Sequence, residues 1–237
     1  MKIAHIADTH IRLYKRHDEY REVFKKLYQS LREHKVDRIA LLGDIFHSKS
    51  ILSPEAVELA AEFFLELAKI SPVDIIIGNH DVNIKNDTRL DAISPIVELV
   101  NASNIKIYRE SGFYTIQESI WYGIFSCLDE QNFPMMSVSF EKYLASTTKK
   151  LKPRPETLIA LFHGNLTGSF AENMYQFENT GYDADILFKN YDMVLLGDIH
   201  KRQEIKCNQI VEEIVDENQL ELLKSKYPDL TILEEIE

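Results

Sequence analysis

Polar residues suited to metal and phosphate chemistry follow an apolar run at residues 75–77. The run ends in Gly78 and presents Asn79, His80 and Asp81, which supply an amide oxygen, an imidazole and a carboxylate. An apolar β-branched run that ends in glycine is typical of a buried strand, and open α/β sheets bind ligands at the carboxyl ends of their strands. This mixture of donors favours a cation that acts on phosphate.

Four further short apolar runs end in similar clusters of His and Asp. The candidate metal ligands are Asp8, His10, Asp44, Asn79, His163, Asp198 and His200, with His80 and His47 beside them. Five of the eight histidines therefore follow predicted strands. One such histidine alone is more often structural than a ligand, but five interleaved with Asp and Asn indicate a metal centre. Carboxylate, amide and imidazole together suit Mn, Fe or Zn better than an all-oxygen Ca or Mg cage does.

The number of candidate ligands exceeds what one ion requires. We therefore expect two metals about 3.5–4 Å apart, bridged by a carboxylate, for which Asp44 is the best candidate. Such a pair activates water for attack on phosphorus. The leaving oxygen needs a proton, which a histidine close to the metals can donate. We assign this role to His80, with His47 as the lesser candidate.

Other catalytic devices are absent from the sequence. It contains no G-x-G-x-x-G or G-x-x-x-x-G-K-[ST] loop and no serine in a nucleophile-elbow sequence. A nucleotide-driven enzyme or an acyl transferase is therefore not indicated.

Strands and helices must bring these clusters together. Apolar runs predict strands at residues 2–7, 38–42, 75–77, 157–162 and 191–196, and helical spacing predicts helices at about 20–31, 54–70 and 90–100. Ser53 is the expected N-cap of the second helix, with Pro54 in its first turn. This alternation predicts a mainly parallel sheet. We also expect antiparallel strands of a second sheet at 105–128, a helix at 137–150 and a long loop at 165–189.

Composition and charge limit the class of protein. The chain has 237 residues, 45% of them hydrophobic, which suffices for a packed core. Cys127 and Cys207 fit neither a disulfide framework nor a zinc-ligand spacing. No apolar run approaches membrane-spanning length and no signal-peptide core is present, so we expect a soluble cytoplasmic protein without a membrane partner.

The net charge of −11 does not exclude DNA as a partner. Residues 204–237 hold ten acidic and three basic residues and so carry −7 of that charge. Bound cations would offset several of the other carboxylates.

Five motifs resemble, in order, those of the calcineurin-like metallophosphoesterases. They are Asp8-Thr9-His10, Gly43-Asp44, Gly78-Asn79-His80-Asp81, His163-Gly164 and Gly197-Asp198-Ile199-His200. The resemblance covers about residues 1–203, and the residues that flank three of the motifs look most like the SbcD-type nucleases.

The resemblance implies a fold, a metal centre and an activity. The implied fold is a four-layered αββα sandwich with two Mn²⁺ ions, Fe, Zn or Mg being the alternatives. One ion would bind Asp8, His10, Asp44 and His200, the other would bind Asp44, Asn79, His163 and Asp198, and His80 would be the transition-state histidine. The implied activity is that of a DNA nuclease in break processing, an exonuclease on duplex ends and an endonuclease on hairpins or single strands. An SbcC-like ATPase subunit is the expected partner. Whether the chain also forms a homodimer is left open.

Two departures from the family pattern bear on this reading. Position 198 is Asp, where the closing motif usually has His, which adds negative charge to the metal centre. Only 34 residues follow Gln203, too few for further strands, a DNA-capping domain and an ATPase-binding segment. We therefore expect a nuclease domain at 1–203, an acidic helical tail at 204–237, no capping domain and a second sheet whose completeness is open.

Two other functions remain open. The chain could be a metallophosphoesterase that acts on a small phosphodiester or a phosphoprotein. It could also be a truncated relative that binds DNA or a partner without catalysis.

Overall fold

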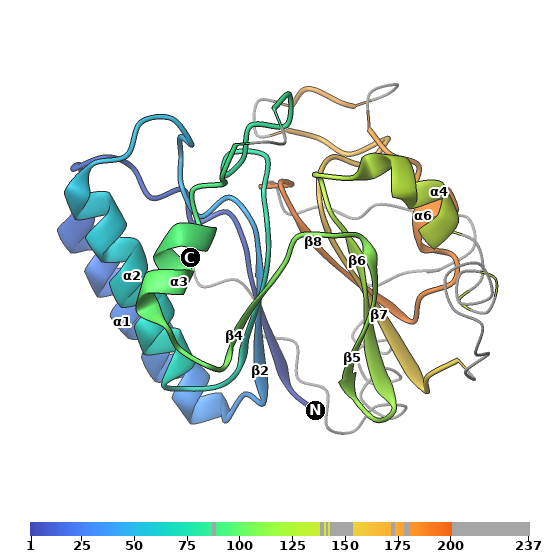
Figure 1. The fold of residues 1–237 in the computed structure, drawn as a ribbon, viewed down its shortest axis with the longest axis horizontal. Coiled ribbons are helices and arrows are strands. Elements are labelled where there is room, and N and C mark those ends of the chain that lie inside the picture. Colours follow the sequence, from blue (N-terminus) through green and yellow to red (C-terminus); the bar gives the residue numbers. More distant parts are fainter. Residues whose placement is uncertain are drawn as a thin grey trace. The chain divides into compact units, whose positions relative to one another are not determined.

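The computed structural model describes residues 1–200 except for 87–88, 138–139, 141, 143–153, 172–173 and 178–180. The chain forms two compact units, one spanning Met1–Ile107 and one beginning at Tyr108. Each unit contains a four-stranded sheet with helices packed beside it (Figure 1). The predicted α/β class with two sheets is therefore confirmed. The predicted domain boundary at 203 and the acidic tail at 204–237 lie outside the described residues.

The N-terminal unit is built from alternating strands and helices. Its sheet has the order β1-β2-β3-β4, with β1 paired to β2 and β2 to β3 in parallel. The helices of this unit lie on one side of the sheet (Figure 1). The elements are β1 (Ile3–Ile6), α1 (His17–His34), β2 (Arg38–Leu42), α2 (Pro54–Ala68), β3 (Val73–Ile76), α3 (Ser94–Val100) and β4 (Ile105–Tyr108).

Side-chain hydrogen bonds lie at the starts of two helices in this unit. The Ser53 hydroxyl accepts the Ala56 backbone N–H at 3.2 Å, which confirms the predicted N-cap of α2. Helix α3 begins at Ser94, later than the predicted Leu90. The Asp91 carboxylate accepts the N–H groups of Ile93 and Ser94 at 2.9 and 2.6 Å, and these bonds hold the preceding residues outside the helix.

The core of the N-terminal unit lies between its sheet and its helices. Strand β3 is buried along its whole length, and the Phe24 and Phe63 rings of α1 and α2 stack with centroids 4.2 Å apart. At the amino end of β3, the fully buried Asp74 carboxylate accepts two bonds from the Arg38 guanidinium, at 2.7 and 2.8 Å.

The second unit contains a mixed sheet. Its order is β5-β6-β7-β8, and only the β5–β6 pair is antiparallel. The prediction that residues 105–128 form antiparallel strands of one second sheet was thus partly wrong, because β4 joins the first sheet. The elements are β5 (Gly112–Gln117), β6 (Ile120–Phe125), the 3-10 turn η1 (Glu130–Asn132), α4 (Phe133–Met136), β7 (Thr157–His163), α6 (Ala184–Phe188) and β8 (Met193–Gly197).

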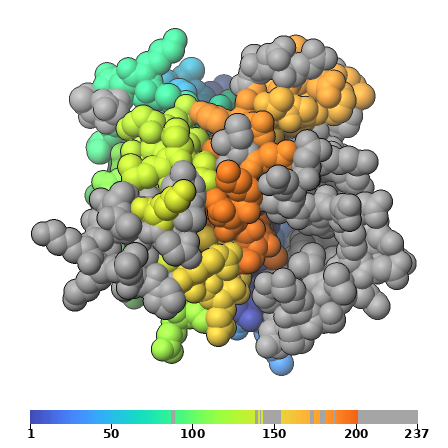
Figure 2. All heavy atoms as spheres, turned by 90° about the vertical axis from the view of Figure 1, so that its right-hand side faces the viewer, coloured from blue at the N-terminus to red at the C-terminus, as the bar shows by residue number. Residues whose placement is uncertain are grey.

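Helices α4 and α6 contact each other beside this second sheet (Figure 1). Figure 2 shows residues of the second unit, coloured yellow-green to orange, on the surface that faces the viewer. Residues 165–189 were predicted as a loop, but they include α6, which is too short for its apolar spacing to stand out. Most of the helix predicted at 137–150 lies outside the described residues.

Aromatic side chains dominate the core of the second unit. Phe125 packs edge to face against Phe162 and Phe188, with centroids 6.3 and 5.6 Å apart. Gly123 is required here because a Cβ at this position would lie 2.3 Å from a ring carbon of Tyr191.

Within the described part of the chain, none of the helices combines the length and apolar character needed to cross a membrane.

Candidate metal centre

The carboxyl ends of β1, β2 and β3 lie at one edge of the first sheet. Because the strands are parallel and in register, Ile6 pairs with Leu41 and Leu42 pairs with Ile76. The loops that leave these strands therefore emerge together, as the sequence predicts. Backbone bonds from Asp8 N–H to the Gly43 carbonyl (3.1 Å) and from His10 N–H to the Asp44 carbonyl (2.9 Å) tie the first two loops to each other.

Asp8, His10 and Asp44 form one group of donors in this unit. The His10 Nε2 atom lies 3.9 Å from Asp8 Oδ1 and 3.6 Å from Asp44 Oδ2. Asp44 is 1% exposed, so its carboxylate charge lies inside the protein. Two carboxylates and an imidazole turned toward one another are the hard and borderline donors that a divalent transition metal prefers. The residues present therefore fit a metal ion.

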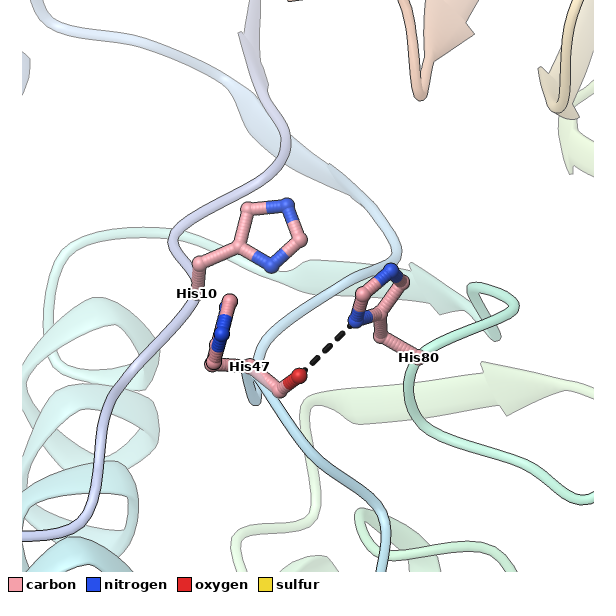
Figure 3. A group of neighbouring side chains, drawn as sticks. All are labelled: His10, His47 and His80. Carbon is pink, nitrogen blue, oxygen red and sulfur yellow. Dashed lines mark hydrogen bonds between the residues drawn. The ribbon is translucent and has the colours of Figure 1, made fainter.

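Two further histidines, His47 and His80, lie next to this group. The rings of His10 and His80 have centroids 5.0 Å apart, and His47 lies 5.8 Å from His10 and 6.0 Å from His80 (Figure 3). His80 Nδ1 lies 2.8 Å from the backbone carbonyl of His47 (Figure 3). A carbonyl only accepts, so Nδ1 must carry the proton of this bond. This contact orients the His80 ring and directs its Nε2 atom to any further partner.

Asp44 also holds the loop that follows β3. Its Oδ1 atom accepts the backbone N–H of His80 at 2.8 Å. The close contact explains Gly78, because a Cβ there would lie 2.2 Å from the same oxygen. Asn79 lies between these two residues, and its backbone carbonyl accepts a bond from Lys49 Nζ at 2.8 Å. The predicted residues Asn79 and His80 are therefore fixed to the loop that carries Asp44.

Several candidate ligands adopt the left-handed backbone conformation. The φ angles are 57° at Asp8, 45° at His10, 53° at Asp44 and 78° at Asp198. Such conformations cost about 1–3 kcal/mol in residues other than glycine and concentrate at functional sites. Half of the eight non-glycine residues with positive φ in the described ranges are thus predicted metal ligands.

The second unit places two further candidates together. His163 ends β7 and pairs in register with Gly197 of β8, so Asp198 follows directly beside it. His163 Nε2 lies 3.9 Å from Asp198 Oδ1, and the imidazole is buried. His200 is exposed two residues later. An imidazole beside a carboxylate again fits a divalent cation.

Two residues outside the predicted set support the histidines and the loops. The Tyr20 hydroxyl donates to the His10 backbone carbonyl at 2.7 Å, and partial burial raises the pKa of this tyrosine. Asp81, which the sequence presents beside His80 as a further carboxylate donor, is fully buried and accepts backbone N–H groups instead. In the sequence, Tyr20 belongs to the apolar face of a predicted helix, and nothing there indicates its bond to His10. The local sequence also does not show whether the Asp81 side chain points into the protein or toward the candidate metal ligands.

Most of the chain is similar to a known protein family. Residues 1–202 match the family model of the calcineurin-like phosphoesterases. The uncharacterized protein R555 of Acanthamoeba polyphaga mimivirus is 36% identical over 213 residues, which are 88% of this chain and 15% of that protein. The DNA double-strand break repair protein Mre11 of Methanopyrus kandleri is 36% identical over 104 residues, 40% of this chain and 22% of that protein.

The chain thus spans less than a quarter of the length of either relative. Among solved structures, the Pseudomonas putida nuclease MPE is matched at 17% identity with a TM-score of 0.36, over 72% of this chain and 64% of that one.

Proposed function

Because this chain belongs to the calcineurin-like phosphoesterase family, whose members use divalent metals, we propose that it is a metal-dependent nuclease that hydrolyses phosphodiester bonds in DNA. The observation that carries the proposal is the convergence of Asp8, His10 and Asp44 next to His80. The similarity of part of the chain to an Mre11 break-repair protein supports DNA as the substrate class.

Both groups of candidate ligands contribute to metal binding in this proposal. Asp8, His10, Asp44 and Asn79 would do so from the first unit, and His163, Asp198 and His200 from the second. When bound, the divalent ions activate water and offset negative charge on the phosphate oxygens. We propose Mn²⁺ as the metal, because carboxylate, amide and imidazole ligands suit it.

His80 is the residue that we propose to donate a proton to the leaving oxygen. Its Nδ1–H is held by the His47 carbonyl at 2.8 Å, and its backbone N–H is held by Asp44 at 2.8 Å. Nε2 is then the ring nitrogen that can exchange a proton with a substrate. The bonds to the His47 carbonyl and the Asp44 carboxylate together set the direction in which this atom points. Such positioned proton donors accelerate a reaction by about 10²–10⁴-fold.

The partner and the branch of the family are part of the same proposal. The SbcD-like motifs favour a nuclease that processes duplex ends, hairpins or single strands together with an SbcC-like ATPase. Co-purification of the chain with such an ATPase, compared between wild type and a chain shortened to residue 203, tests this part.

DNA digestion with purified protein is the experiment that tests the proposal. End-labelled linear duplex and circular single-stranded DNA are incubated with Mn²⁺ and wild type, His80→Ala, Asp44→Ala or the control His34→Ala. His34 is an exposed histidine in the last turn of α1, where Lys2 at the amino end of β1 donates to its backbone carbonyl, so it lies away from the carboxyl ends of the strands. We expect wild type and His34→Ala to degrade DNA and the other two variants to lose at least 10²-fold in rate.

A small chromogenic diester in the same assay separates the alternatives. Cleavage of the diester with both DNAs left intact would support a phosphoesterase of small molecules or phosphoproteins. The third alternative is a relative that binds DNA without catalysis, and it is motivated by Asp198 in place of the usual histidine. Folded, metal-loaded protein that cleaves none of the substrates but retards duplex DNA in a gel would support it.

A further inference from the structure

We infer that Asp81 positions the metal-binding loop after β2, an inference that rests on the proposed function. Asp81 ends the Gly78–Asp81 motif, yet its side chain is 0% exposed. Its Oδ2 atom accepts the backbone N–H groups of Ile45 and Gly78 at 3.3 and 3.1 Å. Its Oδ1 atom accepts the N–H of Phe46 at 3.0 Å. One carboxylate thus bridges the ends of β2 and β3.

The two loops hold each other through a pair of carboxylates. Asp81, from the loop after β3, accepts amides of the loop after β2. Asp44, from the loop after β2, accepts the His80 amide at 2.8 Å. The two amides that Asp81 accepts from the loop after β2, those of Ile45 and Phe46, come directly after Asp44, whose φ is 53°. Asp81 therefore fixes the backbone that sets the direction of the Asp44 carboxylate.

Charge and shape are both required for this role. Hydrogen bonds to an ionised carboxylate are about twice as strong as bonds between neutral groups. An asparagine has the same shape, but one of its two terminal atoms donates and cannot accept an amide N–H. Asp81→Asn would therefore leave either Phe46 or the pair Ile45 and Gly78 facing a donor.

Asp81 acts through Asp44 and does not itself bind the metal. Residues that orient metal ligands in this way typically change metal affinity by about 10–100-fold when they are substituted. We expect a loss of Mn²⁺ affinity within this range in Asp81→Asn.

Mn²⁺ binding to the full chain, followed by the electron paramagnetic resonance signal of the free ion, tests the inference. Asp74→Asn is the matched control, because Asp74 is also 0% exposed, lies at the opposite end of β3 and accepts two bonds from Arg38. Both variants should unfold at lower urea concentration than wild type, but only Asp81→Asn should lose about 10–100-fold in Mn²⁺ affinity.

Each outcome bears on a different statement. Equal Mn²⁺ affinity in wild type and Asp81→Asn, or an equal loss in Asp74→Asn, would overturn the positioning role while leaving the proposed function intact. Failure of wild type to bind Mn²⁺ would contradict the proposed function instead.

Amide exchange provides a test that needs no variant, should Asp81→Asn not fold. In metal-free wild type the amide hydrogens of Ile45 and Phe46 should exchange slowly, because their acceptor belongs to the protein. Exchange of both at the rate of an unprotected chain would refute the role of Asp81.

Discussion

Gly78→Ala is the substitution that tests most directly how closely the loops of the metal centre are packed. A Cβ at position 78 would lie 2.2 Å from Asp44 Oδ1, 2.3 Å from the Asp44 backbone nitrogen and 2.9 Å from its Cγ. Ordinary contacts between carbon and such atoms are about 3.5 Å or longer, so the Asp44 loop must move. Asp44 is 1% exposed, so its side chain cannot relieve the overlap by moving into solvent.

The expected magnitude follows from two contributions. Overpacking a buried position costs about 1–3 kcal/mol, and loss of the bond from the His80 amide to the Asp44 carboxylate costs about 1.5–3 kcal/mol. Because both losses arise from one displacement and are not additive, we expect a decrease of about 3 kcal/mol in the free energy of unfolding. A shift of about 1 Å in a catalytic group can lower the rate about 10²-fold.

Urea unfolding and DNA hydrolysis, measured side by side with Gly123→Ala, check this prediction. A Cβ at Gly123 would lie 2.3 Å from a Tyr191 ring carbon, so this control creates a similar overlap in the core of the second unit. Both variants should lose stability, and only Gly78→Ala should lose about 10²-fold in rate while folded. A rate within twofold of wild type for folded Gly78→Ala would refute the argument that the Asp44 carboxylate must stay where it lies.

Three other predictions concern a hydroxyl, a carboxylate and the metal. Tyr20→Phe removes the bond to the His10 carbonyl and should lower the free energy of unfolding by about 0.5–1.5 kcal/mol. Burial raises the pKa of Tyr20, so its hydroxyl contributes fully to the free energy of unfolding below the ordinary tyrosine pKa of about 10, and this contribution is lost as the pH rises above that value. The difference between wild type and Tyr20→Phe in urea unfolding should therefore shrink above that pH. Asp198→His replaces a carboxylate beside His163 by an imidazole and should shift metal preference from Mn²⁺ toward Zn²⁺, measured by competition binding; an unchanged ratio would argue against Asp198 as a ligand. Removal of the metal with EDTA should abolish hydrolysis and lower the melting temperature. Addition of Mn²⁺ at 100 times its Kd should then raise the free energy of unfolding by about 2.7 kcal/mol. A melting temperature that changes with neither EDTA nor Mn²⁺ would contradict a metal centre.

The sequence alone determined where the chemical groups stand along the chain. Buried strands are short apolar runs, and the polar residues that follow them are local features, so Asp8, Asp44 and His80 could be assigned to strand ends without a structure. The N-cap Ser53 was predictable for the same reason, since the cap contacts an amide three residues away.

The tertiary structure decided which of these groups face one another and which support the rest. Asp81 and His80 are neighbours in sequence, yet the Asp81 side chain is buried against amides from about 35 residues earlier while His80 reaches the carbonyl of His47. The assignment of β4 to the first sheet likewise depends on pairing between distant segments. Local patterns specify the type and period of an element, but the partner of a buried polar group is set by long-range packing, which no short stretch of sequence contains.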